Sequence, residues 1–212
     1  MTQPQIERNR KLGESLVKAL KARHFEACYC TDIEEAKQKL IEWIPQEDTV
    51  AWGGSQTLAE IGAQEMLRDR GQVLIDRDTA KTPEERNTLM RQALTADTFL
   101  MSSNAITEDG QLVNMDGNGN RAAALVYGPR QVIVVAGLNK VAKDLDAAIA
   151  RVRGTAAPTN AQRFPVNTPC KITGMCADCK SPDCICANMV ITRLSKPAGK
   201  IKVILIGEML GM

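Results

Sequence analysis

Apolar residues recur every three or four positions in several stretches of the chain, and this period predicts amphipathic helices. Residues 5–23 show it clearly, because leucines and valine fall on one face while lysines and arginines fall on the other. Capping motifs open two of the stretches, at residues 31–34 (TDIE) and 82–85 (TPEE). The pattern predicts helices at residues 5–23, 33–44, 56–62, 83–96, 121–127 and 139–153.

Extended segments alternate with these helices. The near-continuous apolar run at residues 131–135 is typical of a strand that is buried on both faces of a parallel sheet. A hairpin is predicted at residues 106–113, because Asp109-Gly110 lies between two runs of strand-forming residues. Further strands are predicted at residues 25–29, 49–52, 72–75, 98–102 and 201–206.

The order of strands and helices predicts an α/β fold, a three-layer sandwich with a mostly parallel central sheet and the hairpin near its middle. Residues 1–154 are expected to form the α/β domain. Residues 155–199 are expected to hold a linker, where the periodicity disappears, followed by a cysteine-rich metal-binding segment. Residues 200–212 are expected to return a strand to the main domain.

The charge of the chain is nearly balanced, with 27 Lys+Arg against 25 Asp+Glu and a formal net charge of +2. The basic residues are dispersed, so nucleic acid is not expected as a partner. The N-terminal stretch lacks a basic region followed by an apolar one, and the longest apolar stretches are too short to span a bilayer. A cytoplasmic protein without a membrane span is therefore expected, and thiols stay reduced in that compartment.

Five of the seven cysteines lie close together near the C-terminus, and this density indicates a metal site. Thiolates are soft ligands, suited to zinc or to an iron-sulfur cluster. The compact spacing favours a four-iron (4Fe-4S) cluster over zinc, while unligated thiols and disulfides remain alternatives. Which four would ligate stays open. The candidate metal ligands are Cys170, Cys176, Cys179, Cys184 and Cys186.

Cys28 and Cys30 belong to a predicted strand and are interpreted as core or surface residues rather than ligands. His24 is the only histidine, which excludes a three-histidine metal site and a Ser-His-Asp triad.

A second candidate site is an anion-binding crevice formed by small polar and glycine residues after the predicted strands. In open α/β sheets ligands lie outside the carboxyl ends of the strands, and backbone N–H groups there suit phosphate or carboxylate. Ordinary connecting loops are the alternative reading of the same residues. The candidate ligand-binding residues are Gly53, Gly54, Ser55, Asn104, Gly117, Asn118, Gly119, Asn120 and Arg121. Asp116 and Glu60 are candidate catalytic carboxylates near this crevice, with caps or turn residues as the alternative.

The blocks at residues 103–121 (SNAITEDGQLVNMDGNGNR), 128–135 (GPRQVIVV) and 50–62 (VAWGGSQTLAEIG) resemble the LUD domain of lactate-utilisation proteins. The resemblance implies the fold shared by ribose-phosphate isomerase, glucosamine-phosphate deaminase, coenzyme A transferases and formyltetrahydrofolate cyclo-ligases. It also implies a part in lactate oxidation alongside iron-sulfur partner subunits. The chain is similar to a short branch of the family that ends in a cysteine-rich segment.

Three functions follow as hypotheses, and whether the protein is an enzyme stays open. The first is a LUD-type protein that binds a small anionic ligand and an iron-sulfur cluster and serves oxidation of lactate or a related 2-hydroxy acid. The second is a transferase, isomerase or ligase-like enzyme acting on a coenzyme A ester or sugar phosphate through Asp116 or Glu60, with a structural zinc. The third is a non-catalytic module that binds an oxidoreductase subunit. A homo-oligomer is compatible with all three.

Overall fold

A computed structural model describes residues 2–212, and its centre is a six-stranded sheet in which every pairing is parallel. The strands are arranged in the order β1-β10-β7-β4-β2-β3. Their bounds are β1 Glu26–Cys30, β2 Thr49–Trp52, β3 Val73–Ile75, β4 Thr98–Met101, β7 Gln131–Gly137 and β10 Ile201–Ile206. The α/β class with a parallel central sheet is thereby confirmed.

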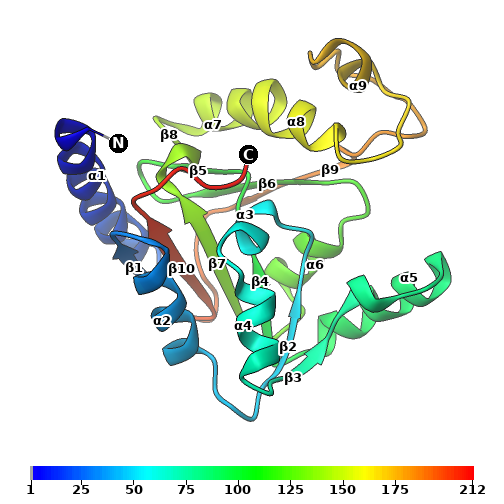
Figure 1. Cartoon of the computed structure of the whole chain (residues 1–212). Coiled ribbons are helices and arrows are strands. Elements are labelled where there is room, and N and C mark those ends of the chain that lie inside the picture. Colours follow the sequence, from blue (N-terminus) through cyan, green and yellow to red (C-terminus); the bar gives the residue numbers. More distant parts are fainter. Residues whose placement is uncertain (1) are drawn as a thin grey trace.

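Both faces of this sheet are covered by helices because its middle strands are apolar on both sides. In β7, Val132 and Val134 enter one core cluster, whereas Ile133 and Val135 enter the other. This alternation follows from the two-residue period of a strand. Helices α1 (Gln3–Ala22) and α6 (Asn120–Val126) cover the first face, and helices α2 (Ile33–Trp43), α3 (Gln56–Glu60) and α4 (Ala63–Asp69) cover the second (Figure 1).

The hairpin belongs to a separate sheet, which corrects its expected place near the middle of the central one. Strands β5 (Ala105–Thr107) and β6 (Leu112–Asp116) pair antiparallel, as predicted. They form a four-stranded sheet, β8-β5-β6-β9, with β8 (Val141–Ala142) and β9 (Asn188–Thr192). Ala105 and Val113 of the hairpin pack against Ala148 and Val152 in a third, small core cluster. This local core gives the hairpin a partner other than the main sheet.

The prediction of a helix at residues 139–153 is wrong for the first turns. A 3-10 turn, Leu138–Lys140, and strand β8 replace them, because Ile106 and Thr107 of β5 pair with residues 141 and 142. Helix α7 begins only at Leu145, where the side chain of Asp144 accepts a hydrogen bond from the Ala147 amide. The helix then ends at Arg151.

The stretch expected to be an aperiodic linker contains regular structure. A π-helical turn, Val152–Ala156, continues α7 directly into α8 (Ala157–Ala161), and α9 (Pro169–Thr173) follows. Helices α7 and α8 run one after the other above the second sheet, and α9 opens the cysteine segment (Figure 1). Pro158 lies directly after the π-helical turn, where the hydrogen-bond pattern of the helix changes.

Two further features lie at the periphery of the central sheet. Helix α5 (Pro83–Gln92) begins as predicted, with Thr82 accepting a hydrogen bond from the Glu85 amide. 3-10 turns Arg77–Thr79 and Ala93–Thr95 flank this helix. In residues 2–212 no helix is both long enough and apolar enough to span a bilayer.

Candidate functional site

A crevice of about 620 Å³ opens at the carboxyl ends of the central strands. The loops after β2, β3, β4 and β7 supply one wall, through Gly53, Arg77, Ser102 and Lys140. The opposite wall comes from α8 and the segments that follow it, including Phe164. Parallel strands end at the same edge of a sheet, so side chains far apart in the sequence meet here.

The glycine pair after β2 lets two arginines lie directly on the loop. A Cβ at Gly53 would come within 2.5 Å of Arg121 Cγ, and one at Gly54 within 2.6 Å of Arg77 Nη2. Neither position therefore tolerates a side chain without displacing an arginine. The hydroxyl of Ser55 accepts a hydrogen bond from the Leu58 amide and so caps α3.

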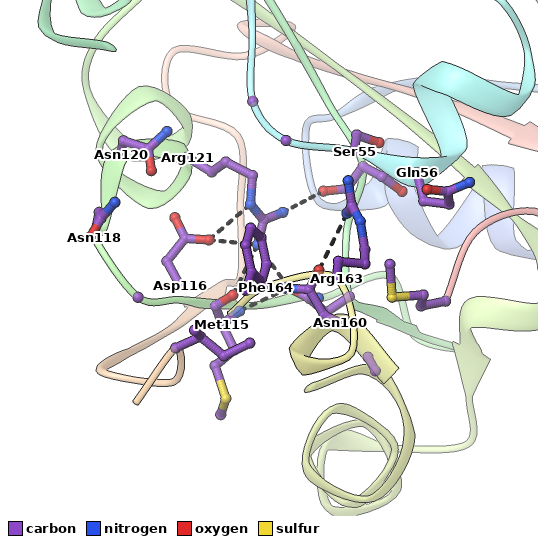
Figure 2. Close-up of a pocket in the computed structure, with 18 of the residues that line it drawn as sticks. Ser55, Gln56, Met115, Asp116, Asn118, Asn120, Arg121, Asn160, Arg163 and Phe164 are labelled. Atoms are coloured by element: carbon purple, nitrogen blue, oxygen red, sulfur yellow. Dashed lines mark hydrogen bonds and ion pairs between the residues drawn. The ribbon is translucent and has the colours of Figure 1, made fainter. Parts of the chain in front are cut away.

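The guanidinium of Arg121 is fully occupied by acceptors of the protein itself. It has five N–H donors, and each is directed to an oxygen between 2.8 and 3.3 Å away. These acceptors are Asp116 Oδ1, Ser102 O, Asn114 Oδ1, Asn104 Oδ1 and Met115 O. Arg121 thus ties the ends of β4 and β6 together, and the donors that sequence reasoning assigned to a ligand are already used (Figure 2).

Asp116 is likewise engaged on both carboxylate oxygens. It is 6% exposed, its Oδ1 lies 2.6 Å from Arg121 Nη2, and its Oδ2 accepts a hydrogen bond from the Ala122 amide at 2.8 Å. A carboxylate held in this way stabilises the turn into α6. Figure 2 shows Asp116 pointing toward Arg121, with Asn118 on the turn and Asn120 at the start of α6.

Arg77 has a different environment. Its side chain is 15% exposed, and among residues 2–212 its buried Nε has no hydrogen-bond partner. The nearest carboxylate oxygen, Asp78 Oδ1, lies 3.7 Å away. Burial lowers the pKa of Arg77, and the nearby Arg86, Arg121 and Arg163 act in the same direction, whereas Asp78 acts against them. A buried guanidinium with an unused donor and cationic neighbours favours a bound anion.

Lys140 is a crevice residue that sequence reasoning missed. It is 4% exposed, and its Nζ donates hydrogen bonds to Thr57 Oγ1 and Ser102 Oγ, both at 2.8 Å. Burial lowers its pKa to about 7, and Arg151 and Arg121 act in the same direction, whereas Glu60 acts against it. The only signal in the sequence was its place directly after the apolar strand that ends at Gly137.

The structure brings most of the expected crevice residues together. Gly53, Gly54, Ser55, Asn104, Asp116, Gly117, Asn118, Asn120 and Arg121 line the same cavity. Gly119 and Glu60 are not among its lining residues. Gly119 takes a positive φ of 76° to cap α6, and Glu60 Oε2 accepts a hydrogen bond from the Gly211 amide at 2.6 Å. Glu60 therefore anchors the segment after β10.

All five cysteines of the C-terminal cluster line a second cavity, of about 240 Å³. Burial, together with the neighbouring Cys184, Cys170 and Cys176, raises the pKa of Cys186 to about 12. A cation would reverse this effect, because thiolates that repel one another are stabilised by a shared metal. Within residues 2–212 no three potential ligands converge as a ready-made metal centre. The thiol-rich donor set suits a soft metal, and binding would draw the thiols closer.

The other two cysteines lie elsewhere, on β1. Cys30 is buried and Cys28 is half-buried, and both pack in the core cluster beneath α2. Trp43 and Trp52 belong to the same cluster.

The crevice and the cysteine cavity share a wall. Met115, Cys184 and Ile185 line both. A Cβ at Gly117 would lie 3.2 Å from Ile185 Cα, so the turn after β6 is in direct contact with the cysteine segment. The pairing of Asp116 with Asn188 across β6 and β9 fixes this contact.

The family model of the LUD domain matches residues 13–206, which include every lining residue of the two cavities except Met212. The crystal structure of a duf162 family protein from Deinococcus radiodurans aligns over 93% of this chain and 98% of its own, with a TM-score of 0.56 and 10% sequence identity. The tetrameric eIF2B-beta2-delta2 complex from C. thermophilum aligns over 81% and 54%, with 16% identity and a TM-score of 0.40. No curated protein matches the chain. The Deinococcus likeness shows a common fold.

Proposed function

This chain belongs to the LUD domain family, and we propose that its crevice binds a small organic anion bearing a carboxylate or a phosphate. The observation that carries the proposal is the unpaired, buried Nε of Arg77 in a crevice lined by further cations. A buried guanidinium charge with incomplete hydrogen bonding destabilises the protein, and an anion bound against the Arg77 side chain in the crevice would compensate that charge.

The balance of charge in the crevice supports the same conclusion. Its basic residues are Arg77, Arg86, Arg121, Arg163 and Lys140, and its acidic residues are Asp78, Asp116 and Asp183. Arg121 neutralises Asp116, and Arg86 lies 3.0 Å from Asp78. With Asp183 included, four arginines face three aspartates, so the crevice has a positive surplus of one charge when Lys140 is neutral and of two when it is protonated. In a partly water-excluded cavity such a surplus attracts anions more strongly than on an open surface.

The five cysteines are proposed to hold an iron-sulfur cluster, with zinc as the alternative metal. Cys170, Cys176, Cys179, Cys184 and Cys186 offer one thiolate more than the four that such a cluster takes. A bound cluster would supply one-electron transfer. The chain's own contribution is the lining of the cavity, in which the apolar residues Pro158, Ala157 and Met189 lie beside the thiols.

The two sites together support a role in oxidation of lactate or a related 2-hydroxy acid in the cytoplasm. In this proposal the crevice holds the acid, and the cysteine segment relays electrons or docks an oxidoreductase subunit. The arginine-rich crevice also favours a second candidate, a phosphorylated or coenzyme A-linked substrate, because guanidinium groups bind phosphate bidentately.

Thermal denaturation with lactate, pyruvate, inorganic phosphate or a sugar phosphate tests the anion site. A ligand that binds the native state raises the Tm by mass action. Arg77→Gln should weaken binding by about 10- to 100-fold, the effect of removing a charged hydrogen bond of about 1.5–3 kcal/mol. Arg8→Gln, on the exposed face of α1, is the matched control and should bind like the wild type. Absence of any shift with all four anions would refute the anion site.

Anaerobic reconstitution with iron and sulfide tests the cluster. The expected product is a coloured protein with four iron atoms per chain, by elemental analysis, as a 4Fe-4S cluster requires. Replacing Cys179 and Cys184 together by serine should abolish the colour, whereas Cys28→Ser on β1 should retain it. A protein that takes up zinc but no iron would favour the structural-metal alternative.

A further inference from the structure

We propose that Lys140 is a nucleophilic amine that forms an imine with the carbonyl carbon of a small 2-oxo acid bound in the crevice. The proposal rests on the anion site described above and adds to it a covalent step and a substrate class. The geometry around the Nζ atom, which no carboxylate neutralises, points to it.

The groups around Lys140 do not stabilise a positive charge on its side chain. Its two hydrogen-bond partners are neutral hydroxyls, Thr57 Oγ1 and Ser102 Oγ. Among residues 2–212 no carboxylate lies within ion-pair distance of its Nζ. The charged groups that face it are Arg151, Arg121 and Glu60, two of them cationic. A lysine so placed favours the neutral amine, which is the nucleophilic form.

The lowered pKa makes the side chain of Lys140 neutral far more often than that of an ordinary lysine. With a pKa of about 7, roughly half of the Lys140 side chains are neutral at pH 7. Fewer than about one in a thousand would be neutral at the ordinary pKa of about 10.4. Other lysines offer a contrast, because Glu108 raises the pKa of Lys143.

A 2-oxo acid fits the neighbouring charges. Its carboxylate suits the arginines of the same cavity, and its carbonyl is the adjacent carbon. The Nζ lone pair would form the N–C bond while the carbonyl oxygen takes up a proton, giving a carbinolamine. Loss of water then gives the imine. Thr57 and Ser102 can relay the proton, since their hydroxyls both donate and accept.

The segment after β10 encloses the amine. A Cβ at Gly211 would lie 3.1 Å from Lys140 Nζ and 2.5 Å from Thr57 Oγ1. The segment is held by Glu60, which accepts from the Gly211 amide, and by Asn139, which exchanges two hydrogen bonds with Leu210. This cover keeps bulk water from Lys140, which preserves its neutral form and limits hydrolysis of an imine.

Borohydride trapping tests the proposal directly. The wild-type protein is incubated with pyruvate at pH 7, reduced with sodium borohydride and digested, and the modified lysines are mapped by mass spectrometry. The expected result is a reduced pyruvate adduct on Lys140 at least about tenfold above that on Lys143, because the neutral fractions differ by more than that. Excess lactate, which lacks the carbonyl, should reduce the adduct by competition.

Two variants serve as controls. Lys140→Met should remove the adduct, and Lys143→Met, on the exposed surface, should leave it unchanged. The wild-type map decides the question even if Lys140→Met fails to fold. Absence of an adduct on Lys140, or equal labelling of Lys140 and Lys143, would overturn the proposal. A pyruvate-induced rise in Tm without an adduct would overturn the imine alone and leave the anion site standing.

Discussion

Single residues decide what the crevice can do, and Arg121 is the clearest case. Its position after a glycine-rich turn predicts an anion-binding fork, yet all five of its donors are used inside the protein. Arg77 follows β3 in a segment with no recognisable motif, and it carries the unpaired donor. Sequence identifies which residue types suit a ligand. The hydrogen bonds in the structure then show which of these residues have donors that are not already used within the protein.

The buried amine of Lys140 gives a prediction about stability. Its folded pKa of about 7 lies below the ordinary value, so the unfolded state binds more protons between about pH 7 and 10. The wild type should therefore gain stability relative to Lys140→Met as the pH rises, by about 1.4 kcal/mol per pH unit within that window. Below pH 7 the difference should be constant. Urea denaturation at about pH 6, 8 and 9.5 measures it, and a flat difference would contradict the buried neutral amine.

Sequence reasoning found the residues of the crevice loops because these loops follow strongly apolar strands. It missed Lys140, since one lysine after a strand is unremarkable until its burial is known. It also shifted one helix cap by a residue: Asp32, rather than Thr31, accepts from the Glu35 amide. The carboxylate of Glu35 accepts a hydrogen bond from the amide of Thr31, one residue before the N-cap, so the predicted capping box is replaced by a related pair of hydrogen bonds.

At the scale of elements, helices and strands with a strong hydrophobic period were predicted well from the sequence, whereas short elements were not. The middle strands of the central sheet, such as β4 and β7, are apolar on both faces, and that signal is local. Strand β9, by contrast, is half-exposed and exists because β6 offers it an edge. Strand β8 likewise depends on β5 and replaces the first turns of the expected helix. Tertiary pairing of this kind leaves little trace in the local sequence.

The hairpin turn allows a test at this scale. Gly110 has a φ of +89°, and a Cβ there would lie 2.9 Å from the backbone carbon of Ala19 in α1. Gly110→Ala should lower the free energy of unfolding by at least about 2 kcal/mol, through backbone strain and displacement of α1. Gly154→Ala, where no atom lies within 4 Å, is the control and should be close to neutral. Equal stability of the two variants in urea would show that the turn does not press on α1.

At the scale of the whole molecule, the two cavities form one continuous region with Met115, Cys184 and Ile185 as their common wall. Events at the cysteines should therefore alter the crevice, and by thermodynamic linkage the reverse holds as well. The coupling needs no long pathway, because the same side chains line both cavities.

Alkylation measures this coupling. Treatment of the metal-free protein with iodoacetamide should weaken binding of the most stabilising anion by about 5-fold or more, typical of coupled sites. Saturation with that anion should slow modification of Cys184, followed by peptide mapping. Cys28, which is half-buried on β1, serves as the internal reference. An unchanged affinity for the anion after complete alkylation of Cys184 would mean that the two sites are not coupled through the shared wall.

The place of β10 between β1 and β7 has a consequence for biosynthesis. A ribosome makes β1 and β7 before β10, so the nascent sheet exposes two unpaired, apolar strand edges until residues 201–206 emerge. The roughly 60 residues after β7 take about 3–12 s to synthesise at about 5–20 residues per second. The cysteine segment is made within this interval, so it leaves the ribosome before β10 inserts between β1 and β7.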